Sequence, residues 1–171
     1  QSVDEDNSLL INYIATDANN DALTATVTAT NGTAVITEAG QILFTPNANF
    51  NGAAEIVLTI TDGLLTTIQT IAITVNPVND VPTISADATT VIEDAAALLT
   101  TGGTITVVDV DVNESFVTPQ TNVAGLYGTF NIAANGVWTY SADNTQSAIQ
   151  ALGETETLTE TFAVTSLDGT A

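Results

Sequence analysis

The sequence predicts an all-β protein built from two β-sandwich domains in tandem. Three observations lead to this prediction. Thr, Val and Ile dominate and alternate with a period of two residues, turn signals containing Gly and Asn recur at short intervals, and one short and one long sequence pattern each occur twice. Helix signals are nearly absent. Because 44% of the 171 residues are hydrophobic, the chain can fill packed cores and is not expected to be disordered.

Strands and turns alternate along the whole chain. Polar and apolar side chains alternate in residues 55–61, 67–75, 103–108 and 160–166, which are predicted to be strands. Turn signals separate the apolar stretches, at Asn31-Gly32, Ala39-Gly40, Asn51-Gly52, Asp62-Gly63, Asn135-Gly136 and Asp168-Gly169. Many short strands joined by such turns are typical of a sandwich or a barrel.

An internal repeat divides the chain. The stretch Val3–Asp6 recurs as Val91–Asp94, and the stretch from Gly32 to Phe44 recurs without a gap from Gly128 to Tyr140. We therefore predict a first domain at residues 1–77, with a partial first strand, a linker at 78–82 and a second domain at 83–171. The joint at residues 76–82 is short and carries two prolines, which predicts a stiff spacer.

The charge balance restricts the function. The chain has 20 Asp and Glu residues but no Lys, Arg or His, so its formal net charge is −20. Carboxylates held together by folding repel one another, and only cations from solution can neutralise them here. Nucleic acid and anionic membrane surfaces are excluded as partners, and no apolar run is long enough for membrane insertion. Because His, Cys and Lys are all absent, an enzyme is not expected.

Several motifs carry a family resemblance. Residues 44–52, 61–63 and 75–80 resemble the cadherin-like tandem repeats of large bacterial surface proteins. Residues 103–111, 127–130, 136–140 and 157–169 are similar to VCBS repeats, which occur in many copies in giant adhesins of the RTX-adhesin type. The resemblance implies two immunoglobulin- or cadherin-like Greek-key sandwiches, located extracellularly at a bacterial cell surface. Such repeats end in a further strand, so the second sandwich is expected to lack its last strand within this sequence.

The loops of such sandwiches lie at alternate poles, and this places the acidic residues. Three groups of oxygen ligands are expected to converge on the joint, one from each domain and one from the linker: Glu5, Asp6, Asn76, Asn79, Asp80, Asp109, Asp111 and Asp168. The loop with Asp109 and Asp111 also contains Asn113 and Glu114. Ca²⁺ takes about six to eight such ligands, whereas Mg²⁺ tends to keep its waters and Zn²⁺ prefers nitrogen or sulfur. The sequence therefore predicts a Ca²⁺ site at the joint.

Two further groups are expected to form half-sites at the outer poles. One consists of Asp17, Asn19, Asp21 and Asp62, and the other of Glu93, Asp94 and Asp143. The alternative is that these residues only form turns, because Asp, Asn and Gly are common turn residues. For any single residue this explanation competes with metal binding.

The sequence is compatible with three functions. The first is a structural extender repeat of a large adhesin or surface fibre, in which Ca²⁺ fixes the angle between adjacent repeats of the same protein. The second is an adhesin module that binds a glycan or a protein through its loops. The third is a filament subunit, in which another copy completes the second sandwich by strand addition beside residues 162–166.

Overall fold

The computed structural model describes residues 1–38 and 40–171. The turn predicted at Ala39-Gly40 includes residue 39, which lies outside the described residues. The chain divides into two compact units, Gln1–Asn79 and Asp80–Ala171, and each is described here by itself. Strands make up nearly all of the regular structure, so the predicted all-β fold is confirmed. No helix in the described part of the chain has the length and apolar character needed to cross a membrane.

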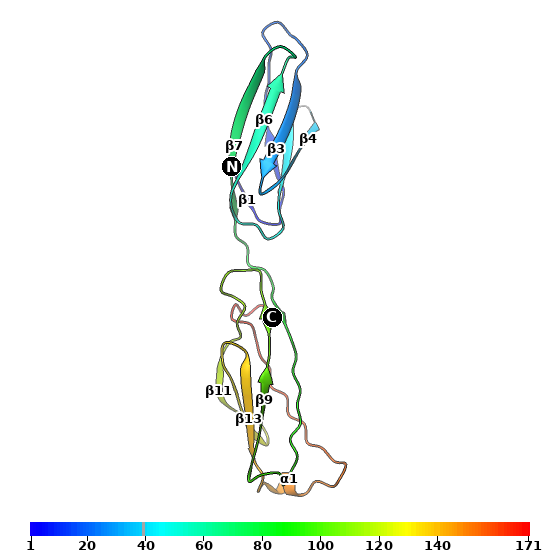
Figure 1. Ribbon diagram of the computed structural model, residues 1–171, viewed down its shortest axis with the longest axis vertical. Coiled ribbons are helices and arrows are strands. Elements are labelled where there is room, and N and C mark those ends of the chain that lie inside the picture. The colour runs from blue at the N-terminus through cyan, green and yellow to red at the C-terminus, as the bar shows by residue number, and fades with distance from the viewer. Residues whose placement is uncertain (39) are drawn as a thin grey trace. The chain divides into compact units, whose positions relative to one another are not determined.

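Unit 1 is a sandwich of two sheets (Figure 1). One sheet has the strand order β1 (Ser2–Asp4), β7 (Thr66–Asn76), β6 (Gly52–Thr61) and β3 (Thr24–Thr30). The other has the order β2 (Leu9–Asn12), β5 (Gln41–Pro46) and β4 (Gly32–Glu38). β1 is parallel to β7, and all other pairs are antiparallel. The strands predicted at 55–61 and 67–75 correspond to β6 and β7.

The core of unit 1 follows from the alternation of side chains along each strand. On β5, Ile42 and Phe44 are fully buried, and on β6 every second residue from Ala54 to Leu58 is buried. Successive side chains of a strand point to opposite faces of the sheet, so the apolar set of each strand faces the opposing sheet. Val3, Ile73 and Val75 complete this cluster from β1 and β7.

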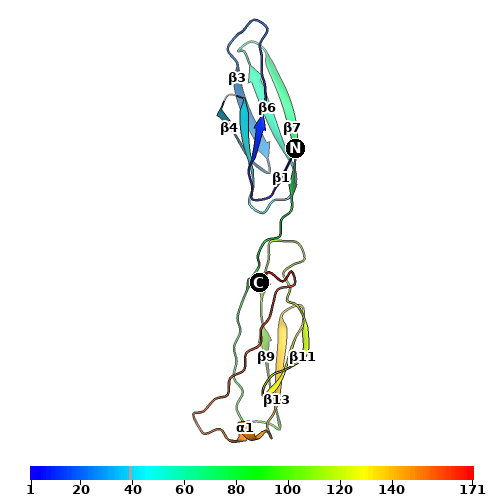
Figure 2. The same cartoon turned by 180° about the vertical axis from the view of Figure 1, so that it is seen from behind.

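Unit 2 is built around a four-stranded antiparallel sheet (Figure 2). Its order is β11 (Gln120–Ala124), β12 (Gly128–Ile132), β13 (Val137–Asp143) and β9 (Leu98–Thr104). A second, two-stranded sheet joins β8 (Thr83–Ile84) to β10 (Val107–Val108), and one short helix, α1 (Ser147–Gln150), follows β13. The main core contains Val117, Phe130, Ile132 and Trp138.

The prediction of a single continuous strand at residues 103–108 is wrong. β9 ends at Thr104, although the amide of the next residue, Ile105, still donates a hydrogen bond to the carbonyl of Gly136. At Thr106 the chain changes partner, because its amide donates to Ser85 Oγ at 2.9 Å and its carbonyl accepts from the Ser85 amide at 2.9 Å. The chain thus passes from one sheet to the other, and the alternation of side chains continues through the change.

The strand predicted at 160–166 is not part of a regular ladder. Its side chains alternate between half-buried or buried and exposed, as in a strand, but its only bridge joins Ser166 to Val117. Phe162 stacks on Phe130 with ring centroids 4.7 Å apart, and Gln120 Nε2 donates to the carbonyl of Ala163. The segment is therefore held mainly by side chains, which a period-two pattern cannot distinguish from backbone pairing.

Candidate metal centre

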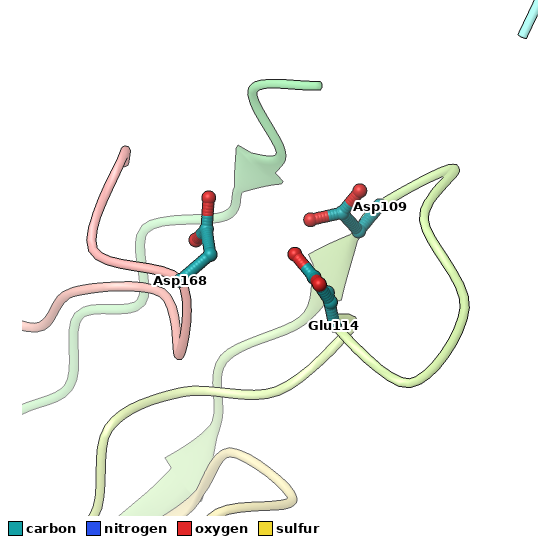
Figure 3. A group of neighbouring side chains, drawn as sticks. All are labelled: Asp109, Glu114 and Asp168. Atoms are coloured by element: carbon teal, nitrogen blue, oxygen red, sulfur yellow. The ribbon is translucent and has the colours of Figure 1, made fainter. Parts of the chain in front are cut away.

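Three carboxylates come together at one end of unit 2. Asp109 follows β10, Glu114 lies in the same loop, and Asp168 lies in the turn near the end of the chain. One carboxylate oxygen from each of the three lies within 4.8 Å of the other two. Figure 3 shows Asp109 and Glu114 projecting from their loop toward the same space as Asp168, which comes from a separate segment. No other group of this kind occurs in residues 1–38 and 40–171.

Local hydrogen bonds give the acidic loop its shape. The Asp111 amide donates to Asp109 Oδ1 at 2.9 Å, and the Asp109 amide donates to Ser115 Oγ at 3.1 Å. Asn113 adopts a left-handed conformation with φ of 68°, which Asn tolerates better than most residues. The loop therefore turns back on itself, so that Asp109 and Glu114 lie on the same side.

Asp168 is positioned by contacts far from it in sequence. Its neighbour Leu167 donates an amide hydrogen bond to the Phe116 carbonyl at 2.9 Å, and Ser166 pairs with Val117. These contacts tie the turn near the end of the chain to the acidic loop. The left-handed Gly169, with φ of 77°, closes this turn.

The cluster is electrostatically unfavourable without a cation. Asp109 Oδ2 and Glu114 Oε2 are shielded from solvent and accept no hydrogen bond from the described residues. Loss of hydration raises the pKa of Glu114 above its ordinary value, and the negative charges of Asp111, Asp109 and Asp168 raise it further. Because the chain has no Lys, Arg or His, the compensating charge must come from solution.

The linker residue Asp80 is tied to this loop. Its amide donates to Asp111 Oδ2 at 2.7 Å, and its own Oδ2 is shielded from solvent. The structure thus brings Asp80, Asp109, Asp111 and Asp168 of the predicted set to one end of unit 2. Glu114 is the member that the predicted ligand set omitted. Its place in the predicted loop, five residues after Asp109, was the sequence signal that could have included it.

The predicted ligands of unit 1 gather at the end where its last strand finishes. Glu5 is only 2% exposed, and its Oε1 accepts a hydrogen bond from the Val78 amide at 2.7 Å. Asn51 Nδ2 lies 3.4 Å from Glu5 Oε2. The Glu5 amide in turn donates to the carbonyl of Asn76 at 2.9 Å. Glu5 is therefore a buried acid whose carboxylate oxygens accept hydrogen bonds from amide groups.

Two further contacts complete this end of unit 1. The Asn49 amide donates to Asp6 Oδ1 at 3.1 Å, and Asn76 Nδ2 donates to Asp4 Oδ1 at 2.9 Å. Asn79 is exposed at the end of the unit. Asp4 was not predicted as a ligand, although it adjoins Glu5.

The oxygens predicted for the outer poles support local structure. Asp17 Oδ1 accepts hydrogen bonds from the amides of Asn19 and Asp21, and Asn19 Nδ2 donates to Asp21 Oδ2. Asp62 Oδ1 accepts from the amides of Leu65 and Leu64, which lowers the pKa of Asp62. These are the hydrogen bonds of Asx turns.

The last predicted group lies at the opposite end of unit 2. Asp94 Oδ1 accepts from Gln150 Nε2 and Asn144 Nδ2, and these hydrogen bonds lower the pKa of Asp94. Glu93 precedes it and is half-buried, whereas Asp143 Oδ1 accepts from the Thr145 amide and hydroxyl. Amide and hydroxyl donors therefore surround Asp94 and Asp143.

A family model for the bacterial cadherin-like domain matches residues 79–171, which is more than half of the chain. The chain belongs to the bacterial cadherin-like domain family. A model for the bacterial Ig domain matches residues 1–74, so the cadherin-like unit follows an Ig-like unit. Both families are structural domains rather than enzymes, and such repeats are typical of bacterial surface proteins of the adhesin type. The narrower resemblance of the second half to VCBS repeats stays a prediction.

Other comparisons add little about this cadherin-like chain. No curated protein matches it significantly. Two solved structures, an endo-fucoidan hydrolase of glycoside hydrolase family 107 and a substituted variant of it, are 17% and 18% identical to it with TM-scores of 0.35. The alignments cover 83% and 84% of this chain but only 22% and 23% of those chains. The chain therefore spans less than a quarter of their length.

The donor set of the cadherin-like unit suits a hard divalent cation. Cadherin-like domains generally bind calcium, and the side chains that converge in unit 2 offer only oxygen ligands. Shielded carboxylate oxygens that lack hydrogen donors are groups that Ca²⁺ would satisfy. Asp109 and Glu114 therefore fit the ion by chemistry as well as by proximity. Asp168, whose carboxylate oxygens accept hydrogen bonds from the amide and hydroxyl of Thr170, fits it by proximity.

Proposed function

We propose that this chain is a Ca²⁺-rigidified extender repeat of a large extracellular bacterial adhesin or surface fibre. The observation that carries the proposal is the cluster of Asp109, Glu114 and Asp168, with two shielded oxygens that accept no hydrogen bond from the described residues. Membership of the bacterial cadherin-like family supports it, since such domains generally bind calcium.

Ca²⁺ is favoured over other ions by the ligands themselves. When bound, it would supply two positive charges to a cluster of three negative ones. Ca²⁺ accepts mixed carboxylate and carbonyl ligands in flexible geometry, whereas Mg²⁺ requires near-octahedral sites and keeps several waters. Extracellular modules bind Ca²⁺ with dissociation constants of about 10⁻⁴–10⁻³ M, a range that a partly exposed site of three carboxylates suits.

Stiffening would begin with the linker. Pro77 and Pro82 restrict the backbone on both sides of Asp80, whose amide is already tied to Asp111. A cation held by Asp109, Glu114 and Asp168 would neutralise the loop that holds Asp80. We therefore propose that Ca²⁺ reduces the motion of the linker as well as stabilising unit 2.

The ligand assignment is tested by calorimetric titration of the full chain with Ca²⁺. Glu114→Gln removes one charged ligand and should weaken binding at least about tenfold. Glu154→Gln is the matched control, because Glu154 is an exposed acid of the same unit outside the cluster, and its binding should equal that of the unsubstituted chain. Equal affinity of the two variants would rule out Glu114 as a ligand.

The mechanical role is tested separately by small-angle scattering. With Ca²⁺ the distribution of molecular dimensions should narrow, and with chelator it should broaden. If Ca²⁺ bound without changing the scattering curve, the metal site would stand but the extender mechanism would be refuted. If no Ca²⁺ bound at millimolar concentration, both the metal site and the extender mechanism would be refuted.

A further inference from the structure

The acidic cluster of unit 2 joins two segments that are far apart in sequence. Asp109 and Glu114 lie in the loop after β10, whereas Asp168 lies in a separate turn, and Figure 3 shows their side chains directed toward one another. The two segments meet at the bridge between Val117 and Ser166, both of which are fully buried. The geometry of the cluster therefore depends on the register of this bridge.

Thr118 holds the register with its backbone and its side chain together. Its amide donates to the carbonyl of Thr165 at 2.9 Å, and its Oγ1 donates to the carbonyl of Ser166 at 2.9 Å. One residue thus binds two successive carbonyls of the segment that leads to Asp168. A slip of that segment by one residue would change the partners of both hydrogen bonds at once. Thr118 therefore fixes where Asp168 reaches the acidic loop.

Farther from the cluster, the segment that carries Asp168 is held against the sheet of unit 2 by side chains. Phe162 stacks on Phe130 of β12 with ring centroids 4.7 Å apart. Gln120 Nε2, from β11, donates to the carbonyl of Ala163 at 2.8 Å. The segment is therefore docked on the sheet along much of its length, and the contacts of Thr118 are those near its acidic end.

The carboxylates act against this docking when no cation is bound. Oxygens of Asp109, Glu114 and Asp168 lie within 4.8 Å of one another, and the chain has no basic side chain to neutralise them. Like charges at such distances repel, and separation of the two segments would relieve the repulsion. The hydrogen bonds of Thr118 oppose that separation.

We propose that Thr118 is a positioning residue of the candidate metal centre. It holds Asp168 in register with Asp109 and Glu114, and it thereby couples Ca²⁺ binding to the docking of residues 160–168 on the sheet. The inference rests on the proposed function, because it names a residue that acts on the same site without being a ligand. Such coupling is reciprocal. A change that weakens the docking weakens Ca²⁺ binding, and bound Ca²⁺ strengthens the docking.

Calorimetric titration of the full chain with Ca²⁺ tests the coupling. Thr118→Val removes the hydroxyl group but keeps the branched side chain and the backbone amide. It should weaken Ca²⁺ binding about two- to tenfold, which corresponds to the loss of one hydrogen bond. Thr118→Ser keeps the hydroxyl group and should bind Ca²⁺ as tightly as the unsubstituted chain does.

Thr145→Val is the matched control. Thr145 is an exposed threonine of the same unit, and its hydroxyl group donates to Asp143 Oδ1 at 2.8 Å away from the cluster, so its loss should leave Ca²⁺ affinity unchanged. The titrations are made at a temperature at which the fluorescence of Trp138, in the core of unit 2, shows every variant to be folded. Unchanged affinity in Thr118→Val, or an equal loss in Thr118→Ser or Thr145→Val, would overturn the proposal.

Hydrogen exchange separates this inference from the proposed function. The Leu167 amide donates to the Phe116 carbonyl beside the bridge. In chelator it should exchange faster in Thr118→Val than in the unsubstituted chain, and Ca²⁺ should slow its exchange in the unsubstituted chain. Equal exchange of this amide in both chains would contradict the role of Thr118 even if Ca²⁺ binds. If no Ca²⁺ bound but Thr118→Val still exchanged faster, the proposed function would fail, whereas the register set by Thr118 would stand.

Discussion

The ring of Phe44 lies directly over Gly32 of the neighbouring strand. A Cβ atom added to Gly32 would be 2.7 Å from Phe44 Cε2 and 2.6 Å from the carbonyl oxygen of Thr45. Gly32 pairs with Pro46, so Phe44 occupies the diagonal position. In unit 2, Gly128 pairs with Ala142 and is likewise covered by Tyr140, at the same diagonal position. The repeated sequence pattern therefore corresponds to a hairpin in which an aromatic ring covers a glycine.

This relationship predicts that Gly32→Ala destabilises unit 1. The added methyl group would have to displace a buried ring or the backbone, which costs about 1–3 kcal/mol. Urea denaturation followed by circular dichroism measures the loss. Gly153→Ala is the control, because its nearest neighbour is a side-chain oxygen of Glu156 at 3.6 Å. Equal effects of the two substitutions would contradict the close packing at Gly32.

Each unit has its own core, which predicts separate responses to core substitutions. Phe44→Ala should destabilise unit 1 by about 3–5 kcal/mol, since Phe44 is fully buried. Phe162→Ala removes the stacking on Phe130 and should destabilise unit 2 by about 3 kcal/mol. Trp138 is the chain's only tryptophan and lies in the core of unit 2, so its fluorescence reports that unit alone. A shift of the fluorescence transition by Phe44→Ala would show that the units are coupled.

The buried Glu5 gives a third prediction. Glu5→Ala leaves the Val78 amide and Asn51 Nδ2 without their acceptor and should cost about 2 kcal/mol in the presence of chelator. Glu5→Gln keeps one acceptor oxygen and should cost about half as much. Thermal denaturation measures both, with the exposed Glu55→Ala as control. If the glutamine variant lost as much stability as the alanine variant, the hydrogen bonds would not be the cause.

The pKa of Glu114 gives a pH dependence with a definite sign. Because this pKa is raised above its ordinary value of 4.5, the folded chain holds the proton more tightly than the unfolded chain does. The contribution of protonated Glu114 to the stability of the folded chain is complete below pH 4.5. It is lost as the pH rises through the raised pKa of Glu114 in the folded chain. In chelator at neutral pH, Glu114→Gln should therefore melt at a higher temperature than the unsubstituted chain. At pH values below the ordinary pKa the two should melt together.

The measurement is a series of melting temperatures from acidic to neutral pH, with Glu154→Gln as the charge-matched control. Adding Ca²⁺ at neutral pH should reverse the order, because only the ionised Glu114 can bind the cation. A Glu114→Gln variant that is less stable than the unsubstituted chain in chelator at neutral pH would refute repulsion within the cluster.

Local patterns predicted most of the strands, because alternation with period two is a property of neighbouring residues. β6, β7 and the repeated hairpins were all predictable in this way. The change of sheet at Thr106 was not, since it depends on hydrogen bonds to Ser85, which lies 21 residues away. Nor was the lack of a ladder at residues 160–164, where side-chain contacts such as the stacking of Phe162 on Phe130 take the place of backbone pairing.

The sequence by itself determined that cations must neutralise this chain, because composition alone shows 20 acids and no basic side chain. It also named the acidic loop after β10. Only the tertiary structure decided which acids face one another. The pairing of Val117 with Ser166 brings Asp168 to Asp109 and Glu114 across more than fifty residues. No comparable group of three acids forms around Asp17, Asp62 or Asp94 in the described part of the chain. Which acids face one another depends on contacts between residues that are distant in sequence, and a local sequence pattern does not contain those contacts.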